Sequence, residues 1–206
     1  MTTLLTVEGE EALRRLNGLN AFYMSSSTTQ VDARPDRLAS GIRTSSARRT
    51  LQETVIVRCV TVIEAYLTDL ARRLVDDRLE RLPPADPALA SLVEHLRDSR
   101  IGGLDQGRWD ELISLWSAGL GIAINQRYSG YTKLVALRAA RHAIAHRYGD
   151  MTDAYRKHHR QRLTKEGFRD PLLARGPLPL TETDVLAGLS LSLSTVRWLE
   201  NAVATS

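Results

Sequence analysis

Hydrophobic residues recur along the chain at intervals of three and four positions, which is the period of an amphipathic α-helix. No run shows the sustained two-residue alternation of a half-buried strand. A first helix is predicted over residues 7–23. The polar stretch 25–50 is rich in Ser and Thr and contains Arg34-Pro35, so it is predicted to be a loop with room for a short helix. The predicted fold class is all-α.

The longest amphipathic segment covers residues 51–82 and predicts the central core helix. Pro83-Pro84 ends it, and Asp86 followed by Pro87 has the form of an N-cap and first-turn proline opening a helix to about residue 97. The apolar face of the long helix consists of Val55, Cys59, Val62, Ile63, Tyr66, Leu70 and Leu74.

Three further helices follow the same pattern. One is predicted over residues 109–120, with an apolar face of Trp109, Leu112, Ile113, Trp116 and Leu120. The next is predicted over residues 131–148, with a stripe of Leu134, Leu137, Ala140, Ile144 and Tyr148 before Gly149. The charged segment 155–170 and the prolines after it predict a loop. The last helix is predicted to begin after Thr181, because a hydroxyl N-cap precedes the first-turn carboxylates Glu182 and Asp184.

Length and composition fit one globular domain. The chain has 206 residues, 43% of them hydrophobic and 25% charged, which excludes the composition of a disordered chain. We therefore predict a single domain over residues 1–206, with an N-terminal helix and polar loop over 1–50 and the core over 51–203.

The distribution of cysteine and charge predicts a cytoplasmic protein without a membrane span. Cys59 is the single cysteine, so no intramolecular disulfide can form. Residues 1–11 carry acidic side chains where a secretory leader would be basic and then apolar. The most apolar stretch, residues 55–70, is interrupted by charges that a bilayer-spanning helix rarely carries.

Net charge makes nucleic acid a plausible partner. The formal net charge is +4, and nearly all of the positive charge is arginine, whose guanidinium can grip a phosphate through two hydrogen bonds. An arginine bias can equally follow from genome composition, so this feature does not decide the question alone.

The string Arg141-His142-Ala143-Ile144-Ala145-His146-Arg147-Tyr148 carries the candidate chemistry. Arg141 interrupts an apolar stripe, where a guanidinium is costly unless it meets a partner or an interface. At about 100° per residue, Arg141 lies roughly 140° from His146, so one regular helix does not pair them. A second copy of the helix, related by a two-fold axis, would bring the two side chains together, and we therefore predict a homodimer. Small residues around the helix would permit close approach of another helix on either flank: Ala136, Ala139, Ala140, Ala143 and Ala145.

These residues match the R-x4-H signature of the HEPN superfamily, with the polar residue His142 after the arginine. The longer form R-x4-H-x-Y, ending at Tyr148, is similar to the motif of HEPN toxins that are paired with a small nucleotidyltransferase antitoxin. The order of helices over residues 51–203 also resembles that family. The resemblance implies a bundle of about five to seven helices that forms a two-fold dimer.

The resemblance further implies a metal-independent endoribonuclease without a cofactor, acting as a toxin or antiviral-defence effector on RNA. Arg141 would grip the phosphate, and His146 would move a proton, because its reference pKa near 6.5 suits an acid or a base. His142 would orient His146 or hold the substrate. Tyr148 would be the hydroxyl to which an antitoxin adds nucleotide. Weaker RNA-binding candidates are Arg147, Arg156, Lys157, His158, His159 and Arg160.

Other interpretations of the same residues stay open. Arg141 can be an inward structural arginine that pairs with a carboxylate such as Glu64. His142 and His146 have zinc-ligand spacing, but Ala143 occupies the place of the metalloprotease glutamate and no third ligand is adjacent, which disfavours a metal site. The basic run 156–160 is typical of a solvated loop. A non-catalytic HEPN domain that binds a partner or a nucleotide is the alternative function.

Overall fold

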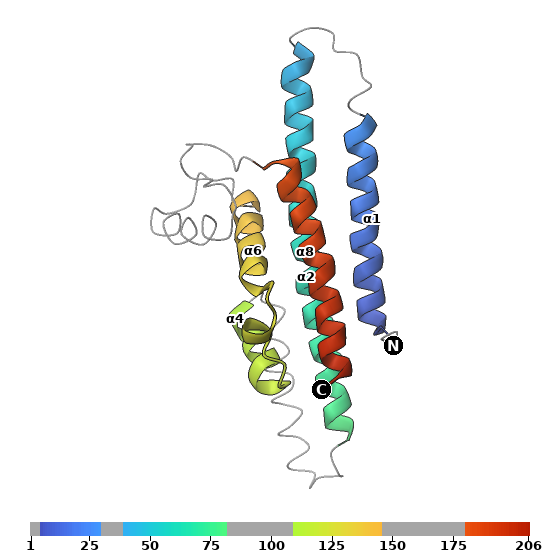
Figure 1. The fold of residues 1–206 in the computed structure, drawn as a ribbon, viewed down its shortest axis with the longest axis vertical. Coiled ribbons are helices and arrows are strands. Elements are labelled where there is room, and N and C mark those ends of the chain that lie inside the picture. The colour runs from blue at the N-terminus through green and yellow to red at the C-terminus, as the bar shows by residue number, and fades with distance from the viewer. Residues whose placement is uncertain (1–4, 30–38, 82–108, 146–179) are drawn as a thin grey trace, which may run out of the picture.

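The computed structural model describes residues 5–29, 39–81, 109–145 and 180–206, and these residues are all-helical (Figure 1). They form six α-helices and one π-helical turn, without a strand among them. The all-α fold class is therefore confirmed. The elements are α1 (Val7–Thr29), α2 (Ala39–Glu80), α4 (Trp109–Ser114), the π-helical turn η1 (Leu115–Gly119), α5 (Ile124–Arg127), α6 (Tyr131–Ala145) and α8 (Glu182–Ala204). The helix predicted over 86–97 and the charged loop 155–170 lie outside the described residues.

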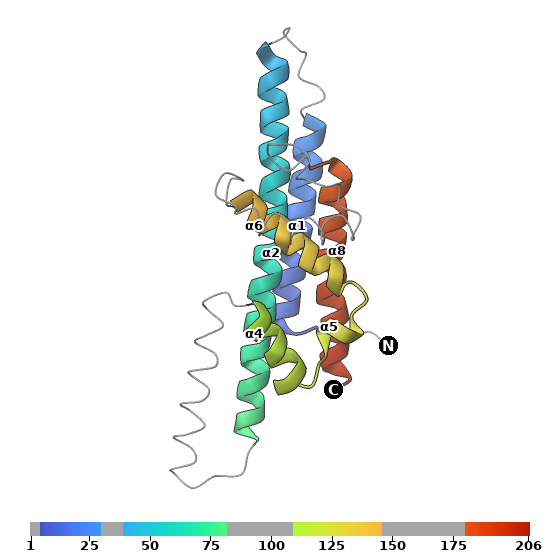
Figure 2. The ribbon, with the colours of Figure 1, turned by 90° about the vertical axis from the view of Figure 1, so that its left-hand side faces the viewer.

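The helices form three layers around α2. Helices α1 and α8 both pack on α2 and on each other, and α6 packs on α2 and α8 (Figures 1 and 2). Figure 2 shows α6 lying obliquely across α2 and α8, on the side away from α1. Helix α6, which carries Arg141 and His142, thus packs against both α2 and α8.

The core follows the predicted apolar faces. Most of the predicted face of α2 is buried, and Val62 and Leu74 pack at its edge. Trp116 is fully buried, and its indole Nε1–H donates to the Leu67 carbonyl at 3.2 Å. Gly188 lets α8 approach α2 and α6 closely, because a Cβ atom at this position would lie 3.0 Å from Ile56 Cδ1 on α2 and 3.1 Å from Leu137 Cδ1 on α6. Trp109 and Trp116 are both buried, as expected for members of the predicted apolar face of residues 109–120.

The prediction of a loop over 25–50 is wrong for the described part of that stretch. Helix α1 continues to Thr29, and α2 begins at Ala39. The hydroxyls of Ser25 and Ser27 donate to carbonyls three residues earlier, at 3.0 and 2.9 Å. These bonds leave the helix continuous, so serine does not end α1 here. Helix α2 extends more than two turns before its apolar face starts, since adding residues to an existing helix is far easier than nucleating one.

The predicted start of the last helix is confirmed. Thr181 Oγ1 accepts from the Asp184 backbone N–H at 3.2 Å, and Asp184 Oδ2 accepts from the Thr181 N–H at 2.7 Å. This reciprocal capping box satisfies donors that the first turn would otherwise leave free.

The turn between α4 and α6 is fixed by α2. Arg78 donates to the carbonyls of Gly119 and Leu120 at 2.9 and 2.8 Å, which caps the end of η1. Gly121 then adopts a φ of 77°, a conformation that glycine tolerates best. None of the described helices has the length and apolar character needed to cross a bilayer.

Candidate functional site

Helix α6 carries the first residues of the motif and is anchored at its start by Tyr128. The Tyr128 hydroxyl lies 2.9 Å from Ser194 Oγ and 3.0 Å from Thr195 Oγ1, and its ring centroid lies 5.0 Å from that of Trp198. Further along α6, Leu134 and Leu137 are buried in the core. The position of the motif helix is therefore set by α8 at one end and by apolar packing along its length.

Arg138 holds α6 to the neighbouring helices. Its Nε donates to Glu64 Oε1 on α2 at 2.8 Å, and its guanidinium carbon lies 5.1 Å from the centroid of the Trp109 ring on α4. A cation over an aromatic face and a partly buried ion pair each favour one orientation of the guanidinium. Glu64 is thus the partner of Arg138.

Arg141 lies one turn further along α6 and is half-buried. The alternative interpretation gave it a structural partner such as Glu64, but the structure gives Glu64 to Arg138. The Nε–H of Arg141 is buried and has no hydrogen-bond partner within the part of the chain that the structure describes. A buried donor left unpaired costs free energy. Because the Arg141 side chain as a whole is only half-buried, its guanidinium group is a candidate contact for a group from outside the chain.

Most of the other predicted site residues lie outside the described ranges. His142 is half-buried on α6, and it takes part in an interaction. The residues outside are His146, Arg147, Tyr148, Arg156, Lys157, His158, His159 and Arg160. The structure therefore describes Arg141 and His142 on one helix, and the pairing of Arg141 with His146 stays a prediction.

Most of the described small residues of α6 face the interior of the chain. Ala136, Ala139 and Ala140 are buried within the single chain. Helices α2 and α8 pack against α6 within the chain, and a contact of α6 with a second copy stays a prediction. Ala145 is exposed, and it alone among the described side chains of this set is available for such a contact.

Two other chemistries find little support among the described residues. Cys59 is buried, and burial raises the pKa of its thiol to about 12, so it is a poor nucleophile at neutral pH. No group of three or more His, Cys, Asp or Glu side chains in the described ranges is placed to hold a metal ion.

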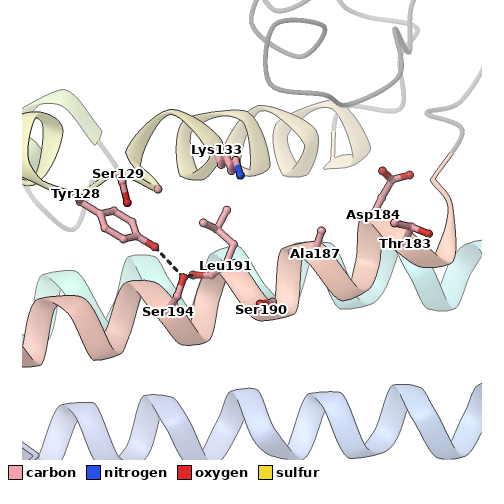
Figure 3. Close-up of a pocket in the computed structure, with 11 residues that line it drawn as sticks. Tyr128, Ser129, Lys133, Thr183, Asp184, Ala187, Ser190, Leu191 and Ser194 are labelled. Atoms are coloured by element: carbon pink, nitrogen blue, oxygen red, sulfur yellow. Dashed lines mark hydrogen bonds between the residues drawn. The ribbon is translucent and has the colours of Figure 1, made fainter.

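An open groove of about 540 Å³ lies between the start of α6 and the first half of α8 (Figure 3). The α6 side contributes Ser129 and Lys133, and the α8 side contributes Thr183, Ala187 and Ser190. We refer to it as the α6–α8 groove. Figure 3 shows Lys133 on α6, facing the α8 segment that contains Ser190 and Leu191.

Sequence reasoning missed the groove and the role of Arg138. The groove joins residues 128–133 with residues 183–194, which are distant in sequence and share no motif. Arg138 carried a usable signal, since it lies three residues before Arg141 and therefore about 60° from it around the helix. Two arginines on one side of a helix compete for one carboxylate, and the sequence alone does not say which one reaches it.

Comparison of the chain with protein-family models, with curated proteins and with solved structures found no match.

Proposed function

We propose that this chain is a HEPN-type, metal-independent endoribonuclease that acts in the cytoplasm as a toxin or defence effector. The observation that carries the proposal is the contrast between two arginines on α6. Arg138 is engaged by Glu64 and Trp109, whereas the buried Nε–H of Arg141 has no hydrogen-bond partner among the described residues. An arginine whose Nε–H has no partner in the described fold keeps a donor that a phosphate could accept from.

In the proposed reaction the ribose 2′-oxygen attacks the adjacent phosphorus, and the bond from phosphorus to the 5′-oxygen breaks. The proton of the 2′-hydroxyl passes to water, and His146 donates a proton to the leaving 5′-oxygen. Arg141 stabilises the negative charge that grows on the phosphate oxygens. His142, one turn before His146, orients it or holds the substrate. The products are a 2′,3′-cyclic phosphate and a 5′-hydroxyl, and no metal or cofactor takes part.

Dimerisation would complete the site. Arg141 and His146 lie about 140° apart on a regular helix, so the proposal brings them together from two copies related by a two-fold axis. Tyr148, two residues after His146, would be the hydroxyl that a nucleotidyltransferase antitoxin modifies. The basic residues at 147 and 156–160 would attract RNA.

The products of the reaction test the proposed function. Purified chain is incubated with a mixed RNA pool in EDTA, and the fragment ends are identified by mass spectrometry. We expect cleavage that EDTA does not reduce, with 2′,3′-cyclic phosphate and 5′-hydroxyl ends, and no cleavage of DNA of the same sequence, because DNA lacks the attacking hydroxyl. Intact RNA would contradict the proposal and favour a non-catalytic, partner-binding HEPN domain. Ends carrying 3′-hydroxyl and 5′-phosphate would contradict the proposed attack by the 2′-oxygen.

A further inference from the structure

The polar lining of the α6–α8 groove consists of hydroxyl groups, the ammonium group of Lys133 and the carboxylate of Asp184, beside apolar surface from Ala187, Leu191 and the Tyr128 ring. Lys133 is the only lysine in the described ranges, and no ion pair of its ammonium group is found there. Ser129, Ser190 and Thr183 expose hydroxyls along the two walls. Lysine and hydroxyl side chains are donors that proteins use to contact phosphate and sugar oxygens of nucleic acids.

The carboxylate in the groove is already engaged. Asp184 Oδ2 accepts from the Thr181 backbone N–H at 2.7 Å and from Thr181 Oγ1 at 2.6 Å. The negative charge also lies in the first turn of α8, where the helix dipole stabilises it. Asp184 therefore serves the capping box, and Lys133 at the other wall is the charge available to a ligand.

The groove and the candidate catalytic arginine lie along the same helix. Lys133 and Arg141 are eight residues apart, which is about 12 Å along α6 and about 80° around it. A polyanion that contacts Lys133 can therefore reach Arg141 by running along α6 while its position around the helix axis changes by less than a quarter of a turn. A short stretch of extended single strand spans that length.

We propose that the α6–α8 groove binds the single-stranded part of the RNA substrate, with Lys133 contacting a phosphate two or more nucleotides from the bond that is cut. This inference rests on the proposed function for the identity of the ligand. The hydroxyls and the Lys133 ammonium group can contact the backbone of the strand, and Leu191 and the Tyr128 ring add an apolar surface that any base can contact, so binding is indifferent to base sequence.

Binding of an uncleavable strand tests the inference apart from catalysis. The probe is a fluorescent, fully 2′-O-methylated oligouridine, which lacks the attacking hydroxyl, and its affinity is measured by anisotropy at several salt concentrations. We expect Lys133→Gln to weaken binding about tenfold and to lower the slope of log affinity against log salt by about 0.7, the value for one lost phosphate contact on a single strand. Lys133→Arg should bind nearly as the original chain does. Arg14→Gln is the matched control, because Arg14 is exposed on α1, away from α6, and its loss should leave the affinity within about twofold.

A second pair of variants blocks the groove without changing charge. Ala187 and Leu186 are adjacent exposed residues of α8, and of the two only Ala187 lines the groove. We expect Ala187→Trp to weaken binding of the probe and Leu186→Trp to leave it unchanged. Equal binding by Lys133→Gln, Ala187→Trp and the original chain would overturn the inference, as would a duplex RNA that binds with the same dependence on Lys133. Because the probe cannot be cut, binding through Lys133 without any RNA cleavage would support the groove and contradict the proposed nuclease instead.

Discussion

Replacing Arg141 with alanine is expected to lower the single-turnover rate of RNA cleavage by about 10²–10³-fold, because one well-placed donor to a developing oxyanion contributes on that order. His146→Ala should cause a loss of about 10²–10⁴-fold, the usual contribution of a general acid. Arg141→Lys should fall between Arg141→Ala and the original chain, since an ammonium group keeps the charge and loses the two-pronged hydrogen bond. Rates are measured with excess protein over a labelled RNA, with EDTA present.

Stability separates a catalytic Arg141 from a structural one. The Nε–H of Arg141 lacks a hydrogen-bond partner among the described residues, so Arg141→Ala should leave the free energy of unfolding unchanged or slightly raised. Arg138→Ala is the matched comparison on the same helix, and it should lower that free energy by about 1 kcal/mol because it removes the contacts with Glu64 and Trp109. Exposed Arg58→Ala on α2 controls for the loss of one positive charge in the cleavage assay. If the Arg141→Ala variant has a lower free energy of unfolding than the original chain and still cleaves RNA, Arg141 is a structural residue and not a catalytic one.

The second large effect is expected at Glu200, whose carboxylate is buried where α8, α1 and α2 meet. Glu200 is 2% exposed and accepts from the Thr6 N–H, the Thr6 hydroxyl and the Tyr66 hydroxyl, each at 2.7 Å. Thr6 in turn accepts from the Gly9 N–H at 3.0 Å, so the carboxylate supports the cap of α1. Burial, followed by the neighbouring Glu200, raises the pKa of Tyr66 well above its usual range, so the phenol stays protonated and keeps donating.

Glu200→Ala should lower the free energy of unfolding by about 3 kcal/mol, because it leaves several buried donors without an acceptor. For a chain of this size that corresponds to a fall in Tm of about 10 °C. Tyr66→Phe removes one donor and should cost about 1 kcal/mol, and exposed Glu10→Ala on α1 should cost less than about 0.5 kcal/mol. Urea unfolding followed by circular dichroism measures all three. If Glu200→Ala were as stable as Glu10→Ala, the buried network would not hold α1 in place.

Gly9 leaves room on α1 for the Glu200 carboxylate. A Cβ atom at Gly9 would overlap the Glu200 carboxylate, so the glycine makes room for the acceptor that caps its own helix. No pattern in the sequence connects the two residues, because positions 9 and 200 lie at opposite ends of the chain and neither belongs to a recognisable motif.

Helices with a strong apolar period could be predicted from the sequence, and polar helices could not. Residues 51–80 and the helix after Thr181 follow from spacing and capping alone, since both signals are local. Residues 39–50 lack an apolar stripe, and their composition resembles a loop. They are helical because they extend α2, and Arg48 of that extension reaches Glu182 on α8 at 2.7 Å. A contact between positions so far apart is a tertiary effect that no local pattern contains.

In the candidate site, too, local sequence patterns predict some features, and contacts between distant segments determine the others. Helical periodicity predicts that Arg141 lies on the inward side of its helix, and its half-buried side chain agrees. Which carboxylate meets which arginine depends on how α6 lies across α2, and that angle is set by Tyr128, Trp109 and the close approach at Gly188. These are packing contacts between distant segments, so the partner of Glu64 could be recognised only in the folded chain.

The central claim, that Arg141 of one copy and His146 of another act on the same phosphodiester, is tested most directly by mixing two inactive variants. Arg141→Ala and His146→Ala are unfolded together in equal amounts, refolded, and assayed for RNA cleavage in EDTA. Random pairing makes half of the dimers mixed, and each mixed dimer retains one of its two sites, so the mixture should recover about one quarter of the original activity. If the mixture is no more active than either variant refolded alone, the two side chains do not meet across a dimer.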